Sequence, residues 1–182
     1  MIPERRPTLL LSGFMGTGKS TVGRALALRL GHPFADLDTI IEEAAGQAIA
    51  DIFAAEGEVG FRERERDALA QLLAETAPAP RVVALGGGAL LDDTSRRHAL
   101  AQAFVITLTA APATILARSE GGSRPLLAAP GPSETPLDRI DQLLKRRAAT
   151  YAQTHLSLST EGRSVAAVVD DVVAHWRPAP AG

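Results

Sequence analysis

The stretch RRPTLLLSGFMGTGKSTVGRAL, residues 5–26, decides the fold of this chain. Its apolar run predicts a buried strand over residues 8–14, and a helical pattern follows over residues 21–30. Glycine weakens both strands and helices, so the three glycines that lie between Ser12 and Lys19 need a physical reason. The segment GFMGTGKS matches G-x-x-x-x-G-K-[ST], the pattern of a phosphate-binding loop, and lies between strand and helix as such a loop requires.

The glycines, Lys19 and Ser20 each have a function in such a loop. Glycine lets consecutive backbone N–H groups approach phosphate oxygens with no Cβ in the way, and the N-terminal end of the following helix favours the same anion. Lys19 would reach the β- and γ-phosphates, and the Ser20 hydroxyl would bind Mg²⁺. Lysine is rare among the 19 basic residues, yet it stands here, where a compact ammonium suits a phosphate pocket. The alternative is a glycine-rich turn without a ligand.

Length and composition limit the classes of protein to consider. A chain of 182 residues with 46% hydrophobic and 22% charged residues favours one globular domain, residues 1–182. A net charge of −2 gives no reason to expect nucleic acid as a partner, and the absence of cysteine excludes disulfides and thiolate metal sites. The apolar run after Arg6 is too short for a secretion signal or a membrane span, so we expect a soluble, cytoplasmic protein.

Strands and helices alternate along the rest of the chain. Further strands are expected at 33–36, 81–85, 104–109 and 156–159, and helices at 39–75 (with breaks at Gly46 and Gly57), 94–103, 113–119, 136–151 and 165–176. Residues 121–136 are rich in Gly, Ser and Pro, a composition typical of a long mobile loop. This alternation predicts an α/β fold in which helices cover both faces of a parallel sheet.

Two carboxylates, Asp36 and Asp38, end the second predicted strand. Alternate strand residues share a face, and ligands of open α/β sheets bind at the carboxyl ends of strands, so both carboxylates can point toward the site. One would lie near Mg²⁺ and the other near an acceptor hydroxyl. The alternative is that Asp38 only caps a helix that starts at Thr39.

Four other polar segments are candidates for the site. The segment FRERE at 61–65 begins a charged helix, which could also be a solvated, salt-bridged face. Gly86-Gly87-Gly88 follows a strand and would expose backbone to a ligand, unless it is a plain turn. Arg124 could close over phosphates, although loop arginines are more often solvated. In Lys145-Arg146-Arg147, one or two side chains at most can face the site.

Taken together, the motifs resemble those of shikimate kinase, a small member of the nucleoside-monophosphate-kinase-like P-loop group. The resemblance covers the chain from about Thr8 to Trp176. It rests on GFMGTGKSTVGRALA, DxD at 36–38, GExGFRxxE at 57–65, GGG at 86–88, RPLL at 124–127 and RxxxY at 147–151. Family members often have Pro after the matched arginine and Leu before the tyrosine, whereas this chain has Ala148 and Thr150.

The resemblance implies a single-domain, three-layer αβα fold with a five-stranded parallel sheet of order 2-3-1-4-5. It implies transfer of the γ-phosphoryl group of ATP to the 3-hydroxyl of shikimate in aromatic amino-acid biosynthesis, with Mg²⁺ as cofactor. A lid at about 119–136, a shikimate-binding helical region at about 39–75 and a monomer are also implied.

The resemblance further assigns residue roles. Around ATP it implies Gly16, Thr17, Gly18, Lys19, Ser20 and Thr21 at the phosphates, Ser20 and Asp36 at Mg²⁺, Arg118 and Arg163 beside adenine, and Arg124 on the lid. Around shikimate it implies Asp38 as base, Arg62 and Arg147 at the carboxylate, Glu65 orienting Arg62, Phe53 and Phe61 as walls, and the turn Gly86, Gly87 and Gly88. The catalytic set is then Lys19, Asp38, Arg124 and Arg147.

Two other functions remain open at this stage. A gluconate kinase is also a short P-loop chain, but it would not predict DxD, FRxxE and GGG together. A nucleotide-binding module without transfer activity would not need Lys19, Asp38, Arg62 and Arg147 together.

Overall fold

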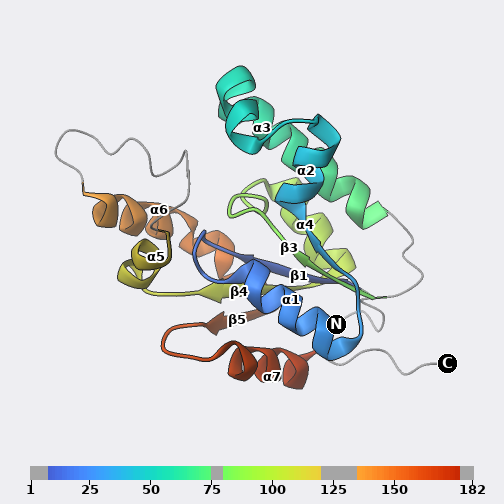
Figure 1. The fold of residues 1–182 in the computed structure, drawn as a ribbon, viewed down its shortest axis with the longest axis vertical. Coiled ribbons are helices and arrows are strands. Elements are labelled where there is room, and N and C mark those ends of the chain that lie inside the picture. Colours follow the sequence, from blue (N-terminus) through green and yellow to red (C-terminus); the bar gives the residue numbers. More distant parts are fainter. Residues whose placement is uncertain (1–7, 75–79, 120–134, 177–182) are drawn as a thin grey trace.

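A five-stranded parallel sheet forms the centre of the molecule (Figure 1). The structure is a computed structural model that describes residues 8–74, 80–119 and 135–176. The strands are β1 (Thr8–Gly13), β2 (Phe34–Asp36), β3 (Arg81–Ala84), β4 (Ala103–Thr109) and β5 (Leu156–Ser159). Their spatial order is β2-β3-β1-β4-β5, which confirms the predicted order.

Helices cover both faces of the sheet, so the three-layer prediction is confirmed (Figure 1). One face carries α1 (Lys19–Leu30) and α7 (Val165–His175), and the other carries α2 (Leu37–Ala45), α3 (Ile49–Ala74) and α4 (Asp93–Gln102). The helices α5 (Pro112–Ser119) and α6 (Pro136–Tyr151) pack together beside the loop that follows β1. None of the helices in the described parts of the chain has the length and apolar character needed to cross a bilayer.

The central strand β1 shows why the sequence forms a sheet that is covered on both sides. Leu9 and Leu11 pack against α1 and α7, whereas Leu10 packs against the helices of the opposite face, and all three side chains are fully buried. Because both faces are covered, the strand is apolar throughout instead of alternating. The edge strand β5 differs, since its two serines are exposed.

The predicted helical region after β2 divides where its glycines stand. Gly46 ends α2 with a left-handed φ of 66°, and Gly57, with a φ of 69°, kinks α3. Both breaks were predicted from the sequence. α6 has the predicted bounds, and Thr135 caps its start in a reciprocal pair with Asp138.

The prediction that Asp38 belongs to a strand is wrong. The strand β2 ends at Asp36, and Asp38 lies in the first turn of α2. The capping residue is Asp36, whose Oδ1 accepts a hydrogen bond from the Asp38 backbone N–H at 3.2 Å. The chain changes from strand to helix within one residue, a sharpness that periodicity over so few residues cannot reveal.

Candidate active site

A pocket of about 820 Å³ opens at the carboxyl ends of the strands. It gathers most of the predicted site residues from separate parts of the chain. Those among its lining residues are Gly16, Gly18, Lys19, Ser20, Thr21, Asp36, Asp38, Phe53, Phe61, Arg62, Glu65, Gly86, Gly87, Gly88, Arg118 and Arg147. Thr17 is instead buried beside the pocket, where its hydroxyl donates to the Phe14 carbonyl at 2.8 Å.

The loop between β1 and α1 has the backbone of an anion site. Gly16 and Gly18 have φ angles of 75° and 92°, a left-handed region that favours glycine. Gly18 is the N-cap of α1, so it brings no side chain to the first N–H groups of the helix. The first turn of α1 holds no acidic residue, and its amides and dipole therefore favour a bound anion.

Lys19 and Ser20 lie at the mouth of this loop. Lys19 Nζ donates to the carbonyl oxygens of Gly13 and Phe14, both at 3.0 Å, which holds the ammonium over the loop. Ser20 Oγ donates to Asp36 Oδ2 at 2.7 Å, so a hydroxyl and a carboxylate oxygen are side by side.

The Ser20 hydroxyl and the Asp36 carboxylate suit Mg²⁺, which takes few of its ligands from the protein, better than a metal ion held entirely by protein side chains. The described residues contain no group of three or more His, Cys, Asp or Glu side chains arranged to hold a metal. Mg²⁺ prefers oxygen ligands and commonly takes one or two from the protein, with the rest from phosphates and water. The donor set of Ser20 and Asp36 therefore suits an ion that arrives with a nucleotide.

Two carboxylates on the other side of the pocket each have an unsatisfied oxygen. Asp38 Oδ1 and Glu65 Oε1 are buried without a hydrogen-bond partner among the described residues. Burial raises the pKa of Asp38, as does the charge of Asp36, while Lys19 opposes the shift. Burial also raises the pKa of Glu65, against the effect of Arg62. Unpaired buried acceptors are costly, which suggests that a ligand completes them.

The glycine turn after β3 is built around these carboxylates. A Cβ at Gly86 would lie 2.9 Å from Asp38 Oδ1 and would collide with Glu65 Oε1. A Cβ at Gly88 would collide with the guanidinium of Arg62. A side chain at Gly86 or Gly88 would therefore displace the charged groups of the site, so the turn is more than a plain reversal of the chain.

The charged side chains of α3 fall into two groups, one that lines the pocket and one that lies outside it. Arg62 pairs with Glu65 at 2.6 Å and with Glu58 at 3.3 Å, and its guanidinium lies in the pocket lining. Although burial opposes it, the charge of Glu65 leaves the pKa of Arg62 raised, so Arg62 stays cationic. The neighbouring Arg64 instead pairs with Glu56 at 2.7 Å outside this pocket. The alternative prediction, a solvated and salt-bridged helix face, therefore holds for Arg64 and not for Arg62.

Aromatic rings border the same region. Phe53 and Phe61 lie with their ring centroids 4.6 Å apart and both line the pocket. The Arg62 guanidinium lies 5.3 Å from the Phe61 ring centroid, a cation–π distance. The two rings thus form an apolar wall next to a cation.

The second arginine comes from α6. Arg147 is 5% exposed and still lines the pocket, where its Nη1 donates to the Gly87 carbonyl at 3.1 Å. Tyr151, four residues later, donates its hydroxyl to the same carbonyl at 2.8 Å. Of the adjacent cations, Lys145 points outward and pairs with Asp141. Tyr151 is a site residue that the sequence analysis did not assign, although its spacing from Arg147 places both on one face of a helix.

Of the two residues expected beside adenine, Arg118 lines the pocket and Arg163 does not. Arg118 lines the pocket and donates to Thr160 Oγ1 at 3.1 Å. Arg163 lies outside the pocket lining, because its guanidinium donates to Asp171 at 2.8 Å and to the Ala167 carbonyl at 3.0 Å. Arg124 and nearly all of the predicted lid lie outside the described residues.

Thr160 was not identified from the sequence. Its hydroxyl oxygen lies 3.2 Å from the carbonyl oxygens of both Thr17 and Thr109, so its one proton is shared between them and connects the phosphate loop with the end of β4. A lone threonine at the end of a strand gives no signal from which this connection could be predicted.

Comparison with known proteins agrees with this geometry. A family model described as shikimate kinase matches residues 15–177. The chain belongs to the shikimate kinase family. The shikimate kinase of Thermus thermophilus is 42% identical over 99% of this chain and 96% of that relative. The one of Symbiobacterium thermophilum is 43% identical over 91% of this chain and 93% of the relative.

Solved structures agree with the shikimate kinase assignment. The structure of shikimate kinase from Acinetobacter baumannii in complex with shikimate has a TM-score of 0.85 at 35% identity, covering 93% of this chain and 92% of that one. A gluconokinase from Sinorhizobium meliloti, at 18% identity and a TM-score of 0.53, shares the fold. As a shikimate kinase family member, the chain is an ATP-dependent phosphotransferase.

Proposed function

We propose that this chain transfers the γ-phosphoryl group of ATP to the 3-hydroxyl of shikimate, giving shikimate 3-phosphate and ADP. The observation that carries the proposal is one pocket lined by a phosphate loop and two arginines, together with Asp38, whose buried Oδ1 has no hydrogen-bond partner among the described residues. The relative from Acinetobacter baumannii, solved with shikimate, supports this choice of acceptor.

The donor half of the reaction belongs to the loop before α1. The backbone N–H groups of residues 16–21 surround the phosphates, and Lys19 neutralises charge on the β- and γ-phosphates. Arg118 borders the nucleotide, and Arg124 would add a further cation from the lid. Arg163 would reach adenine only after leaving Asp171.

Ser20 and Asp36 would hold Mg²⁺ at this site, with Asp36 acting through water. The ion supplies charge neutralisation at the phosphate oxygens. Ser20 and Asp36 already lie within hydrogen-bonding distance of each other, so little rearrangement is needed for Ser20 to bind the ion and for Asp36 to hold a water on it.

The other side of the pocket would bind the acceptor and orient its 3-hydroxyl toward the γ-phosphate. Arg62 and Arg147 would bind the carboxylate of shikimate, since guanidinium groups match carboxylates with paired hydrogen bonds. Glu65 holds Arg62 in place, and Phe53 and Phe61 contact the ring. Asp38 accepts the proton of the 3-hydroxyl as its oxygen bonds to the γ-phosphorus and the bond from that phosphorus to the β-phosphate oxygen breaks.

The proposal includes one domain for residues 1–182, a lid over about 119–136, and an acceptor-binding region over about 39–75. We expect a monomer that acts in the cytoplasm, where ATP is available. Closure of the lid would keep water from competing for the γ-phosphate.

A two-acceptor assay tests the function. ADP release is measured with shikimate and with gluconate at matched concentrations, with Lys19→Met as the control for contaminating kinases. The expected result is turnover of shikimate that depends on Lys19. Turnover of gluconate alone would refute the proposed acceptor, and ATP binding without transfer to shikimate would favour a non-catalytic module.

A further inference from the structure

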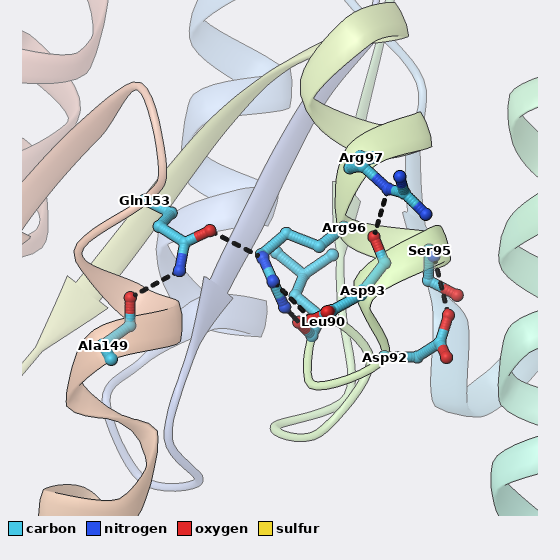
Figure 2. A network of polar contacts seen from close by, with 8 residues as sticks. All are labelled: Leu90, Asp92, Asp93, Ser95, Arg96, Arg97, Ala149 and Gln153. Carbon is cyan, nitrogen blue, oxygen red and sulfur yellow. Dashed lines mark hydrogen bonds and ion pairs between the residues drawn. The ribbon is translucent and has the colours of Figure 1, made fainter.

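A buried arginine outside the pocket lining connects two walls of the acceptor site. Arg96, on α4, is 9% exposed and uses all three nitrogens of its guanidinium. Nε donates to Gln153 Oε1 at 3.0 Å, Nη1 to the Leu90 carbonyl at 3.1 Å, and Nη2 to Asp93 Oδ1 at 2.5 Å (Figure 2). Leu90 lies in the turn before α4, Asp93 on α4 itself, and Gln153 in the turn after α6.

Two of these partners belong to segments that form the acceptor site. Leu90 closes the turn that contains the glycines at 86–88, and its carbonyl faces Arg96. Gln153 follows directly after α6, and its Nε2 donates back to the Ala149 carbonyl at 3.0 Å. Figure 2 shows the Arg96 side chain lying between the end of α6 and the start of α4.

The same two segments meet at a second point. Arg147 and Tyr151 on α6 both donate to the Gly87 carbonyl. The glycine turn is therefore fixed to α6 at Gly87 from the pocket side and, through Arg96, at Leu90 from the far side. These two attachments add to the packing of Ala89 and Leu90 in the core and fix how the turn lies against α6.

Packing alone does not account for this residue. Removing a guanidinium from water is costly, and an apolar side chain of similar size often gives equal or better stability at a buried site. A planar group with donors on three nitrogens does what an apolar residue cannot, because it fixes the directions of three acceptors at once.

We propose that Arg96 is a positioning residue for the acceptor site. It sets the glycine turn against the end of α6, so that the Arg147 guanidinium and the Gly87 backbone present a fixed geometry to the carboxylate of the acceptor. The inference rests on the proposed function, since it concerns how that acceptor is held. None of these three Arg96 hydrogen bonds goes to the phosphate loop, so donor binding stays independent of Arg96.

The test compares Arg96→Met with Arg97→Met. Arg97 is the next residue on α4, is exposed, and donates to the Asp93 backbone carbonyl at 3.3 Å within its own helix. We expect Arg96→Met to raise the KM for shikimate about tenfold, the loss expected when a charge-assisted buried hydrogen-bond network is removed, with the KM for ATP within about twofold. Arg97→Met leaves both constants unchanged.

A milder variant keeps the inference testable if Arg96→Met does not fold. Gln153 is exposed, so Gln153→Ala removes one partner of Arg96 without disturbing a core. We expect about a threefold rise in the KM for shikimate, matched by weaker shikimate binding in calorimetry without ATP. In a folded double variant, Gln153→Ala adds nothing to Arg96→Met, because the two side chains act as one unit.

The outcomes separate the inference from the proposed function. If the unaltered enzyme does not turn over shikimate, the proposed function fails, and the inference fails with it. If the unaltered enzyme is active but Gln153→Ala and every folded Arg96 variant keep its KM for shikimate, only the inference is overturned. Equal rises in the KM values for shikimate and ATP would also overturn it, since they indicate general loosening.

Discussion

Substitution of Gly86 by alanine should slow phosphoryl transfer strongly and leave nucleotide binding intact. An alanine Cβ at this position would lie 2.9 Å from Asp38 Oδ1 and closer still to Glu65 Oε1. Ordinary contacts of a Cβ are 3.4–4 Å, so both carboxylates would have to retreat. Their retreat is limited, because Asp38 Oδ1 and Glu65 Oε1 are buried and the other oxygen of Glu65 pairs with Arg62.

The size of the effect follows from this geometry. A retreat on the order of 0.5–1 Å takes the proposed base away from its hydroxyl, and a misplacement of about 1 Å costs on the order of 10²-fold in rate. We expect kcat for Gly86→Ala to fall by about that factor. Affinity for ATP, measured by calorimetry without shikimate, should be retained, since the atoms nearest the new Cβ belong to Glu65 and Asp38.

Gly87→Ala is the matched control within the same turn. A Cβ there meets Gly13 O and Met15 N at 3.5 Å and Arg147 Nη1 at 3.6 Å, all ordinary contacts. Because it stands in the proposed acceptor site, some loss is expected, but less than about tenfold by the same distance argument. Equal losses in the two variants, or a kcat for Gly86→Ala within threefold of the unaltered enzyme, would refute the reasoning.

Three other predictions concern the charged groups of the acceptor site. Asp38→Asn should lower kcat on the order of 10²-fold or more while ATP still binds in calorimetry, because a carboxamide cannot accept the proton; near-normal turnover would remove Asp38 as base. Arg62→Ala should weaken shikimate binding by about 2–5 kcal/mol, since it also leaves Glu65 buried and unpaired, and an unchanged KM for shikimate would remove Arg62 from the site. Because burial, the largest cause, raises the pKa of Asp38, kcat should fall on acidification at a pH above the range of an ordinary aspartate, and a profile flat down to pH 4 would contradict this.

Local signals predicted where the strands lie and most helix bounds because they agree with the global fold along most of this chain. The strand order came from the resemblance to the shikimate kinase family and was not contained in those local signals. The glycines at 46 and 57 break the helices where left-handed backbone is needed, and β1 is apolar because both of its faces are covered. Asp38 shows where such signals fail. Its helix begins one residue after the strand ends, so a three-residue pattern could not distinguish the two.

The contacts that complete the site could not be predicted from patterns of residues. Tyr151 on Gly87, Thr160 on the phosphate loop and Arg96 on Gln153 join residues that are 64, 143 and 57 positions apart. They depend on how helices pack, and packing is decided by the whole core. The residues that bear chemistry are visible in the sequence, whereas those that hold them in place become visible only in three dimensions.

Burial raises the pKa of Asp38, and this shift helps to distinguish a carboxylate kept for chemistry from one kept for folding. A carboxylate whose pKa is raised by folding destabilises the folded state above that pKa, and the cost disappears as pH falls through it. Asp38→Asn should therefore raise Tm near neutral pH, and the gain should shrink on acidification. A residue whose replacement stabilises the protein and abolishes turnover is maintained for chemistry and not for folding. Asp36 differs in its contacts, because its carboxylate receives hydrogen bonds from Ser20 and from the Asp38 backbone N–H, and its replacement would remove both.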